Sequence, residues 1–180
     1  MPVKSLEDAL VEELKDLLSA EKQMTQSLKK MAKNARNEEL RTAFETHLEE
    51  TENQTRRLEQ VFELLDKPAR AKKCEAMAGL IEESKDVMEH DADDSTMDAM
   101  MIGAAQKAEH YEIASYGTVC TWAEMLGFDE AAELLKESLA EEKATDEKLT
   151  KIAEAINEQA MSAESEEEAS EDEEEDEDAE

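Results

Sequence analysis

Glu109 and Glu112 stand at positions where a helix of this chain should present apolar side chains to a core. Residues 105–116 contain no helix breaker, and steps of three and four residues from Ile102 to Leu126 pass through both glutamates. Two carboxylates one turn apart on an interior face are costly to remove from water unless a positive charge meets them. The spacing therefore predicts a positive partner in the interior of the protein.

Three further segments repeat this pattern of apolar ends and a polar middle. Their seams, the lines of core-facing positions three or four residues apart, run over residues 10–31, 40–65 and 135–156. The polar residues in the middle of these seams are Glu21 in the first segment, His47, Thr51 and Gln54 in the second, and Glu142 and Asp146 in the third. Glu50 lies one turn beyond His47 and borders the same polar patch.

The segments that carry these residues are predicted to be helices, and the protein is predicted to be all-α. Gly and Pro are scarce, with 4 and 2 residues, while Ala, Leu, Glu, Lys and Met dominate the composition. The expected boundaries are a helix start at Ser5, a turn over 34–37, a second helix over 38–65, a short helix over 76–88, a cap at Ser95 or Thr96 for a helix ending near Leu126, and a last helix entered through 127–129.

The long connection over residues 66–97 can travel the length of a bundle, so the helices before and after it should run parallel. Counted from their shared end at about 1.5 Å per residue, the acids of all four long helices fall in one layer at a depth of roughly 20 Å. These six carboxylates cannot all ionise without a counter-charge, and no Lys or Arg occupies the seams. Protonation of several acids or a hydrated interior would also relieve the repulsion, but we favour bound metal cations.

The types of donor in this layer indicate which metals it would hold. Carboxylates with at most one imidazole and no thiolate favour iron or manganese, with zinc as an adventitious occupant. Two cations bridged by glutamates would offset most of the negative charge. Such a centre is of the di-iron carboxylate type that is built on the helices of a bundle.

Five segments of the chain, in this order, resemble the YciE/YciF stress-protein family, which belongs among the ferritin-like proteins. They are residues 17–23, 47–54, 73–80, 109–116 and 141–149, and the resemblance extends over about residues 3–158. It implies a ferritin-like antiparallel four-helix bundle with a long crossover, containing a short helix, between helices 2 and 3. It also implies a dinuclear metal centre, a homodimer and a link to the stress response, but it supplies no defined reaction.

The residues of the ferritin-like metal pattern carry over unevenly to this chain. Glu21 matches the expected glutamate of the first helix, and Glu109 with Glu112 resemble the paired acids of rubrerythrin-like sites. Glu50 and Glu142 match on the other two helices, but Asn53 and Thr145 replace the histidines expected three residues later. The ligand set that we predict is Glu21, His47, Glu50, Glu109, Glu112, Glu142 and Asp146. This set is richer in oxygen donors than that of a ferroxidase.

Two functions follow from such a centre. The first is redox chemistry, in which two iron or manganese ions react with peroxide or oxygen and so limit oxidative damage. The second is a non-catalytic metal-binding or structural role, in which cations stabilise a core that otherwise repels itself. Storage in a ferritin cage is a weaker third hypothesis. We expect Tyr116, one turn from Glu112, to be an ordinary core tyrosine with a satisfied hydroxyl; the alternatives are a hydrogen bond to Glu112 or a radical role.

The charge of the chain restricts its partners. The formal net charge is −30, and residues 162–180 contain 13 acidic residues and no basic ones. Residues 161–180 should therefore form a disordered acidic tail behind a bundle over residues 1–160. The negative surface excludes nucleic acid and anionic membranes as partners. A halophilic source is a further hypothesis, because high salt screens such self-repulsion.

The compartment is inferred from what the sequence lacks. Cys74 and Cys120 are too few and too distant for a zinc motif or a disulfide framework, so we expect two reduced thiols. The N-terminus has no apolar signal core, and no run approaches the ~20 apolar residues of a membrane span. The prediction is a cytoplasmic protein.

Overall fold

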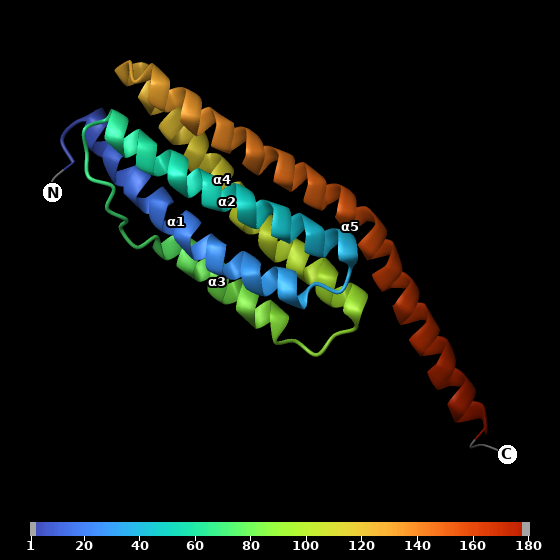
Figure 1. Ribbon diagram of the computed structural model, residues 1–180. Helices are drawn as coiled ribbons and strands as arrows, with labels where there is room; N and C mark the ends of the chain where they lie inside the picture. Colours follow the sequence, from blue (N-terminus) through green and yellow to red (C-terminus); the bar gives the residue numbers. More distant parts are fainter. Residues whose placement is uncertain (1–2, 178–180) are drawn as a thin grey trace.

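The computed structural model describes residues 3–177, and the side chains of residues 3–162. The elements are five helices: α1 (Leu6–Asn34), α2 (Glu38–Leu64), α3 (Glu75–Met88), α4 (Asp94–Leu126) and α5 (Asp129–Glu177) (Figure 1). No strand occurs between residues 3 and 177. The predicted all-α class is therefore confirmed, and the short helix in the long connection is present as α3.

Local capping explains where several of these helices begin and end. Ser5 starts α1 as predicted, because its hydroxyl accepts a hydrogen bond from the backbone N–H of Asp8 at 3.0 Å. The predicted cap of α4 is wrong by two or three residues. Asp93 is the cap instead, since its carboxylate accepts from the backbone N–H groups of both Ser95 and Thr96, which belong to the first turn. Gly127 ends α4 in the left-handed conformation at φ 78°, which glycine adopts without a steric penalty.

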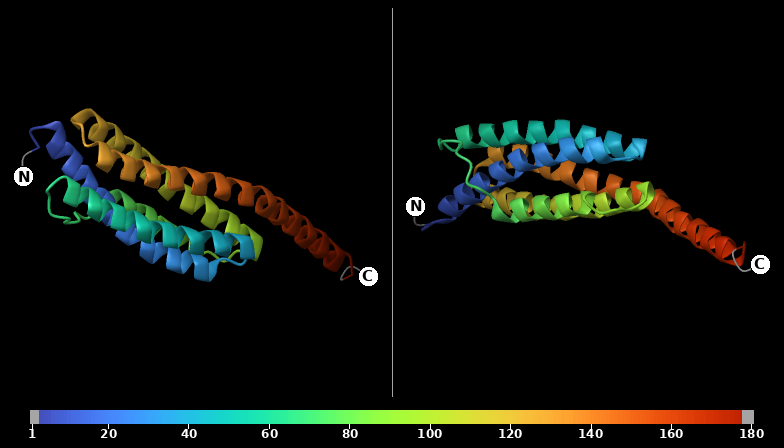
Figure 2. Two further views of the ribbon diagram at one scale, coloured as in Figure 1. Left: turned by 45° about the horizontal axis from the view of Figure 1, so that its top comes forward. Right: turned by 90° about the horizontal axis from the view of Figure 1, so that it is seen from below.

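The helices form a bundle in which α1 and α2 run antiparallel, as do α4 and α5 (Figures 1 and 2). The most extensive packing is between α4 and α5 and between α1 and α2, while α2 with α5 and α1 with α4 join the two pairs. α2 and α4 run in the same direction, because α3 and its flanking loops return the chain to the starting end. α3 itself packs along α1 and α4.

The turn between α1 and α2 is fixed by a buried carboxylate of a distant helix. Asp98 on α4 accepts hydrogen bonds from the backbone N–H groups of Arg36 at 3.0 Å and Asn37 at 2.6 Å. Asn37 in turn caps α2 through its side-chain oxygen. This contact ties the first helix pair to the second and so sets the relative heights of α2 and α4 along the bundle.

The core consists of two apolar clusters with a polar layer between them. One cluster includes Leu28, Phe44 and Ile152, and the other includes Leu14 and Leu58. Every predicted seam residue of α1 and α2 is buried, including the polar residues in the middle of each seam. The repeat of three and four residues therefore gave the correct interior face for both helices.

The predicted seam of α5 is wrong at three positions. The buried residues are Ser138, Thr145 and Ile152, whereas the predicted residues one position later are partly exposed and lie beside the seam: Leu139, Asp146 and Ala153. From Glu142 to Leu149 a helix can keep one face by a step of three and then four, or by four and then three. The folded chain takes the first option.

α5 continues as a helix to Glu177, and its last part extends beyond the other helices (Figure 1). Residues 178–180, and the side chains of residues 163–180, lie outside the described part of the chain. The division into a bundle over residues 1–160 and a disordered acidic tail over 161–180 stays a prediction.

Candidate metal centre

Four of the seven predicted ligands meet in the polar layer: His47 from α2, Glu109 and Glu112 from α4, and Glu142 from α5. One nitrogen or oxygen atom from each lies within 4.8 Å of the corresponding atoms of the others. The Nε2 atom of His47 lies 3.0 Å from Glu109 Oε1 and 3.9 Å from Glu142 Oε2. All four side chains are buried. Three carboxylates and one imidazole at this spacing have the donor chemistry of a transition-metal site.

The buried atoms of this layer lack partners within the protein, although buried polar atoms normally have them. The atoms without a hydrogen bond are both carboxylate oxygens of Glu109 and of Glu142, Oε1 of Glu112, Oε2 of Glu21 and Nε2 of His47. The contact of His47 with Glu109 at 3.0 Å is a charge contact that lacks hydrogen-bond alignment. Each unmet buried group costs about 1–3 kcal/mol. A cation bound among these atoms would satisfy many of them at once, so the residues fit a metal.

The electrostatics of the layer point the same way. Burial raises the pKa of Glu112 and of Glu142 well above the ordinary value, and neighbouring carboxylates reinforce the effect. Burial has the largest single effect on His47 and lowers its pKa, but the neighbouring carboxylates of Glu109, Glu50 and Glu112 together raise that pKa well above the ordinary value. Without a cation, the layer therefore keeps protons that these groups would lose in water. A bound metal would take their place, because ligands must be deprotonated to coordinate it.

Glu21 on α1 lies in the same interior but outside the group of four. It is fully buried, and the Tyr116 hydroxyl donates a hydrogen bond to its Oε1 atom. Burial raises the pKa of Glu21 to about 8, although the Tyr116 hydrogen bond acts in the opposite direction. The prediction of a core tyrosine with a satisfied hydroxyl is confirmed for Tyr116. The alternative partner Glu112 does not accept this hydrogen bond, because Glu21 reaches the hydroxyl from α1.

Glu50 lies at the rim of the layer. Its Oε2 atom is 3.6 Å from His47 Nδ1, and its side chain is 34% exposed. The nearby imidazole of His47 lowers the pKa of Glu50. A carboxylate on the second ring nitrogen is the usual way in which a protein orients a metal-binding histidine.

Asp146 also lies outside the group of four. Its Oδ1 atom is 3.0 Å from the amide nitrogen of Gln106 and 3.4 Å from the imidazole of His110. Sequence reasoning missed Thr145, whose hydroxyl lies 3.4 Å from His47 Nδ1. Its place three residues after Glu142, where the ferritin-like pattern expects histidine, was the available signal.

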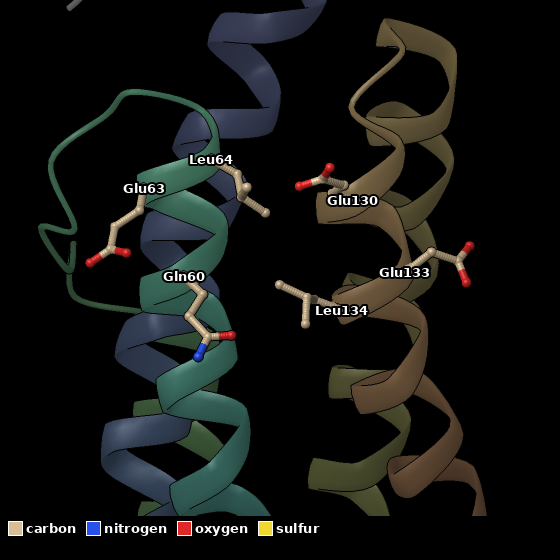
Figure 3. A pocket seen from close by; sticks show the side chains of 6 residues that line it. All are labelled: Gln60, Glu63, Leu64, Glu130, Glu133 and Leu134. Carbon is tan, nitrogen blue, oxygen red and sulfur yellow. The ribbon is translucent and has the colours of Figure 1, made fainter.

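The surface has a separate hollow at one end of the bundle, between the end of α2 and the start of α5. Its volume is about 640 Å³, and Leu64 and Leu134 point into it from the two helices (Figure 3). Glu63, Glu130 and Glu133 line its edges. Leu134 packs against the apolar cluster that contains Leu14, so this hollow does not open into the polar layer.

Among the described residues, no helix combines the length and apolar character needed to cross a membrane.

The fold and the site together define a class: an all-helical bundle with a buried histidine and carboxylate cluster suited to a cation. Residues 5–162 match the protein family described as Domain of unknown function (DUF892). The chain is also 51% identical to Protein YciF of Escherichia coli strain K12 over 166 residues, which are 92% of this chain and 99% of that protein. The chain belongs to this family, as the resemblance to the YciE/YciF proteins had predicted.

Solved structures show the same relationship. The crystal structure of the E. coli stress protein YciF superposes with a TM-score of 0.84 at 50% identity, covering 87% of this chain and 99% of that one. YcfI from Rhodopseudomonas palustris gives a TM-score of 0.80 at 42% identity, with 82% and 94% covered. A protein from Xanthomonas campestris pv. campestris gives 0.74 at 26% identity, with 89% and 99% covered.

Proposed function

We propose that this protein is a ferritin-like stress-response protein whose core binds two metal ions, iron or manganese, and reacts with peroxide or oxygen. In this proposal α1, α2, α4 and α5 are the antiparallel four-helix bundle, and residues 65–93 with α3 are the crossover. The observation that carries the proposal is the set of buried carboxylate oxygens without partners at the centre of the bundle. A zinc ion in this site would be an adventitious occupant.

The residues of the layer take different parts in this function. His47, Glu109, Glu112 and Glu142 would hold the first ion, because their donor atoms already converge. Glu21, Glu50 and Asp146 are the remaining proposed ligands. Tyr116 holds the carboxylate of Glu21 by its hydrogen bond, and Glu50 orients the imidazole of His47. Iron or manganese held there would supply electrons to peroxide or oxygen, while the apolar clusters on both sides exclude water.

A second candidate is a non-catalytic role in which the cations only stabilise the fold. The raised pKa values of Glu112 and Glu142 favour it, since they show how poorly this interior accommodates charge without a cation. The relative YcfI is described as a proposed structural protein, whereas YciF is described as a stress protein. The description of YcfI supports the structural candidate, and the description of YciF supports a stress response without naming a reaction.

One experiment separates these functions. The metal-free protein is titrated with Fe(II) without oxygen, its metal content is measured, and hydrogen peroxide is then added. Consumption of peroxide as the bound Fe(II) is oxidised, with a change in absorbance, and renewed consumption after dithionite has reduced the metal again, supports the redox function. Metal-dependent melting without peroxide consumption supports the structural role. A protein that binds neither Fe(II) nor Mn(II) would contradict both.

The proposal includes a homodimer in the cytoplasm, and a source that lives in high salt. Sedimentation tests the homodimer, and thermal melting at several salt concentrations tests the adaptation to high salt. We expect a dimer, and a melting temperature that falls as salt is removed, because the net charge of −30 is then no longer screened. A monomer at all concentrations would contradict the dimer.

A further inference from the structure

Gln54 on α2 is a fully buried amide whose oxygen has no hydrogen-bond partner. Its nitrogen is satisfied, because Nε2 donates to Glu141 Oε2 at 3.1 Å. The amide nitrogen thus has a hydrogen-bond partner, whereas the amide oxygen has none and is shielded from bulk solvent. An unpartnered acceptor of this kind requires a donor or a cation in its place.

The orientation of the amide follows from its neighbour. Both oxygens of Glu141 accept from the guanidinium group of Arg57, each at 2.6 Å, so this carboxylate offers acceptors to the amide of Gln54. The amide of Gln54 must therefore turn its NH₂ group toward Glu141. A flipped amide would face one acceptor with another. The Arg57–Glu141 ion pair consequently forces the amide oxygen to point away from it.

The position of Gln54 places that oxygen at one end of the polar layer. Gln54 follows His47 by two helical turns on the same buried face of α2. Its partner Glu141 precedes Glu142, a member of the convergent group.

We propose that the amide oxygen of Gln54 is a neutral donor to a metal ion in this layer, and that the Arg57–Glu141 ion pair positions it. This inference rests on the proposed metal function and extends it to a residue outside the carboxylate and histidine set. Carbonyl oxygens suit Mn²⁺ as carboxylates do. A neutral donor completes a coordination shell without adding charge to a layer that already has several buried acids.

The test measures Mn(II) binding to the full-length metal-free chain by the electron paramagnetic resonance signal of free Mn(II). Gln54→Met keeps the length of the side chain and removes the oxygen, and thioether sulfur is not a ligand for Mn²⁺. We expect Mn(II) binding at least about tenfold weaker. The melting temperature of the metal-free variant should stay unchanged or rise, because an unmet buried acceptor is gone. Gln60→Met, at an exposed position of the same helix, is the matched control and should bind as the wild type does.

Two more variants separate a metal donor from a packing role. Gln54→Glu keeps an oxygen at the same place and should retain wild-type Mn(II) affinity within about threefold, although its metal-free form is destabilised beside Glu141. Arg57→Lys removes the bidentate hold on Glu141 and should weaken Mn(II) binding by a smaller factor, with an unchanged circular dichroism spectrum. This variant provides the answer if Gln54→Met does not fold.

The outcomes are distinct. Wild-type affinity in Gln54→Met, or equal losses in Gln54→Met and Gln54→Glu, overturns the inference and leaves the proposed function intact. Where Gln54→Met does not fold, wild-type affinity in Arg57→Lys overturns it. A wild-type protein that binds no Mn(II) or Fe(II) overturns the proposed function, and the inference with it.

Discussion

Two groups of polar side chains include residues of α4, and their hydrogen bonding is opposite. In the first, which we call the α3 anchor, the Tyr111 hydroxyl donates to Asp16 at 2.6 Å and lies 3.0 Å from Cys74 Sγ. The backbone N–H of Cys74 donates to Ser19 at 3.0 Å, and its carbonyl oxygen accepts from Gln23 at 3.1 Å. Each of these side chains has a partner, and together they hold the start of α3 against the bundle.

The polar layer around Glu109 and Glu142 is the second group, and its carboxylate oxygens have no such partners. The difference shows that burial of polar side chains is not by itself the mark of a binding site. Polar groups that hydrogen-bond to one another make a structural contact, whereas several buried acceptors without hydrogen-bond partners indicate a binding site for a cation. The contrast predicts that the two groups respond oppositely to substitution and to added metal.

The largest effect is expected from Glu112→Ala. This change removes a carboxylate from the middle of the convergent group, so we expect metal affinity to fall at least about 100-fold, more than for a residue that only supports a ligand. Metal content of the purified variant, measured by elemental analysis, checks this. Glu147→Ala, at an exposed position of α5, is the control and should keep its metal. An unchanged metal content in Glu112→Ala would contradict the site.

Addition of metal should raise the free energy of unfolding of the wild-type protein. A ligand that binds only the folded state contributes about 2.7 kcal/mol at 100 times its Kd, and the layer provides that differential affinity only when the chain is folded. Urea unfolding with and without Mn(II) gives the value, and Mg(II) at equal ionic strength is the control for general screening. Equal stabilisation by both ions would assign the effect to surface charge.

A matched pair of tyrosines tests the comparison directly. Tyr116→Phe removes the hydrogen bond to Glu21, so we expect metal binding to weaken about tenfold, as for other residues that support a ligand. Tyr111→Phe removes the donor to Asp16 and should cost about 1–3 kcal/mol of folding stability while metal affinity stays unchanged. Metal titration and urea unfolding of both variants measure the two effects. The same loss of metal affinity in both would erase the distinction between the two groups.

The sequence predicted much of the polar layer but not the α3 anchor, for reasons that particular residues show. The heptad count found Glu21, His47, Glu109, Glu112 and Glu142, because apolar neighbours on both sides fixed the buried face of each helix. It chose Asp146 over Thr145, because both satisfy the helical period and only packing selects between them. It could not find the Tyr111–Asp16 contact, since neither residue lies on a seam. Contacts between helices depend on heights and rotations that periodicity leaves open.

The smallest effect is expected at Cys74, which belongs to the α3 anchor. Its sulfur accepts a hydrogen bond from the backbone N–H of Met77 at 3.3 Å and so caps α3. Serine is a favoured residue at this position, so Cys74→Ser should change folding stability by less than about 1 kcal/mol, whereas Cys74→Val loses the cap and should cost about 1 kcal/mol or more. Neither variant should change metal content, because the thiol is buried and burial raises its pKa. If Cys74→Ser lowered metal content, the α3 anchor would be part of the metal centre, and the two groups could no longer be treated as independent.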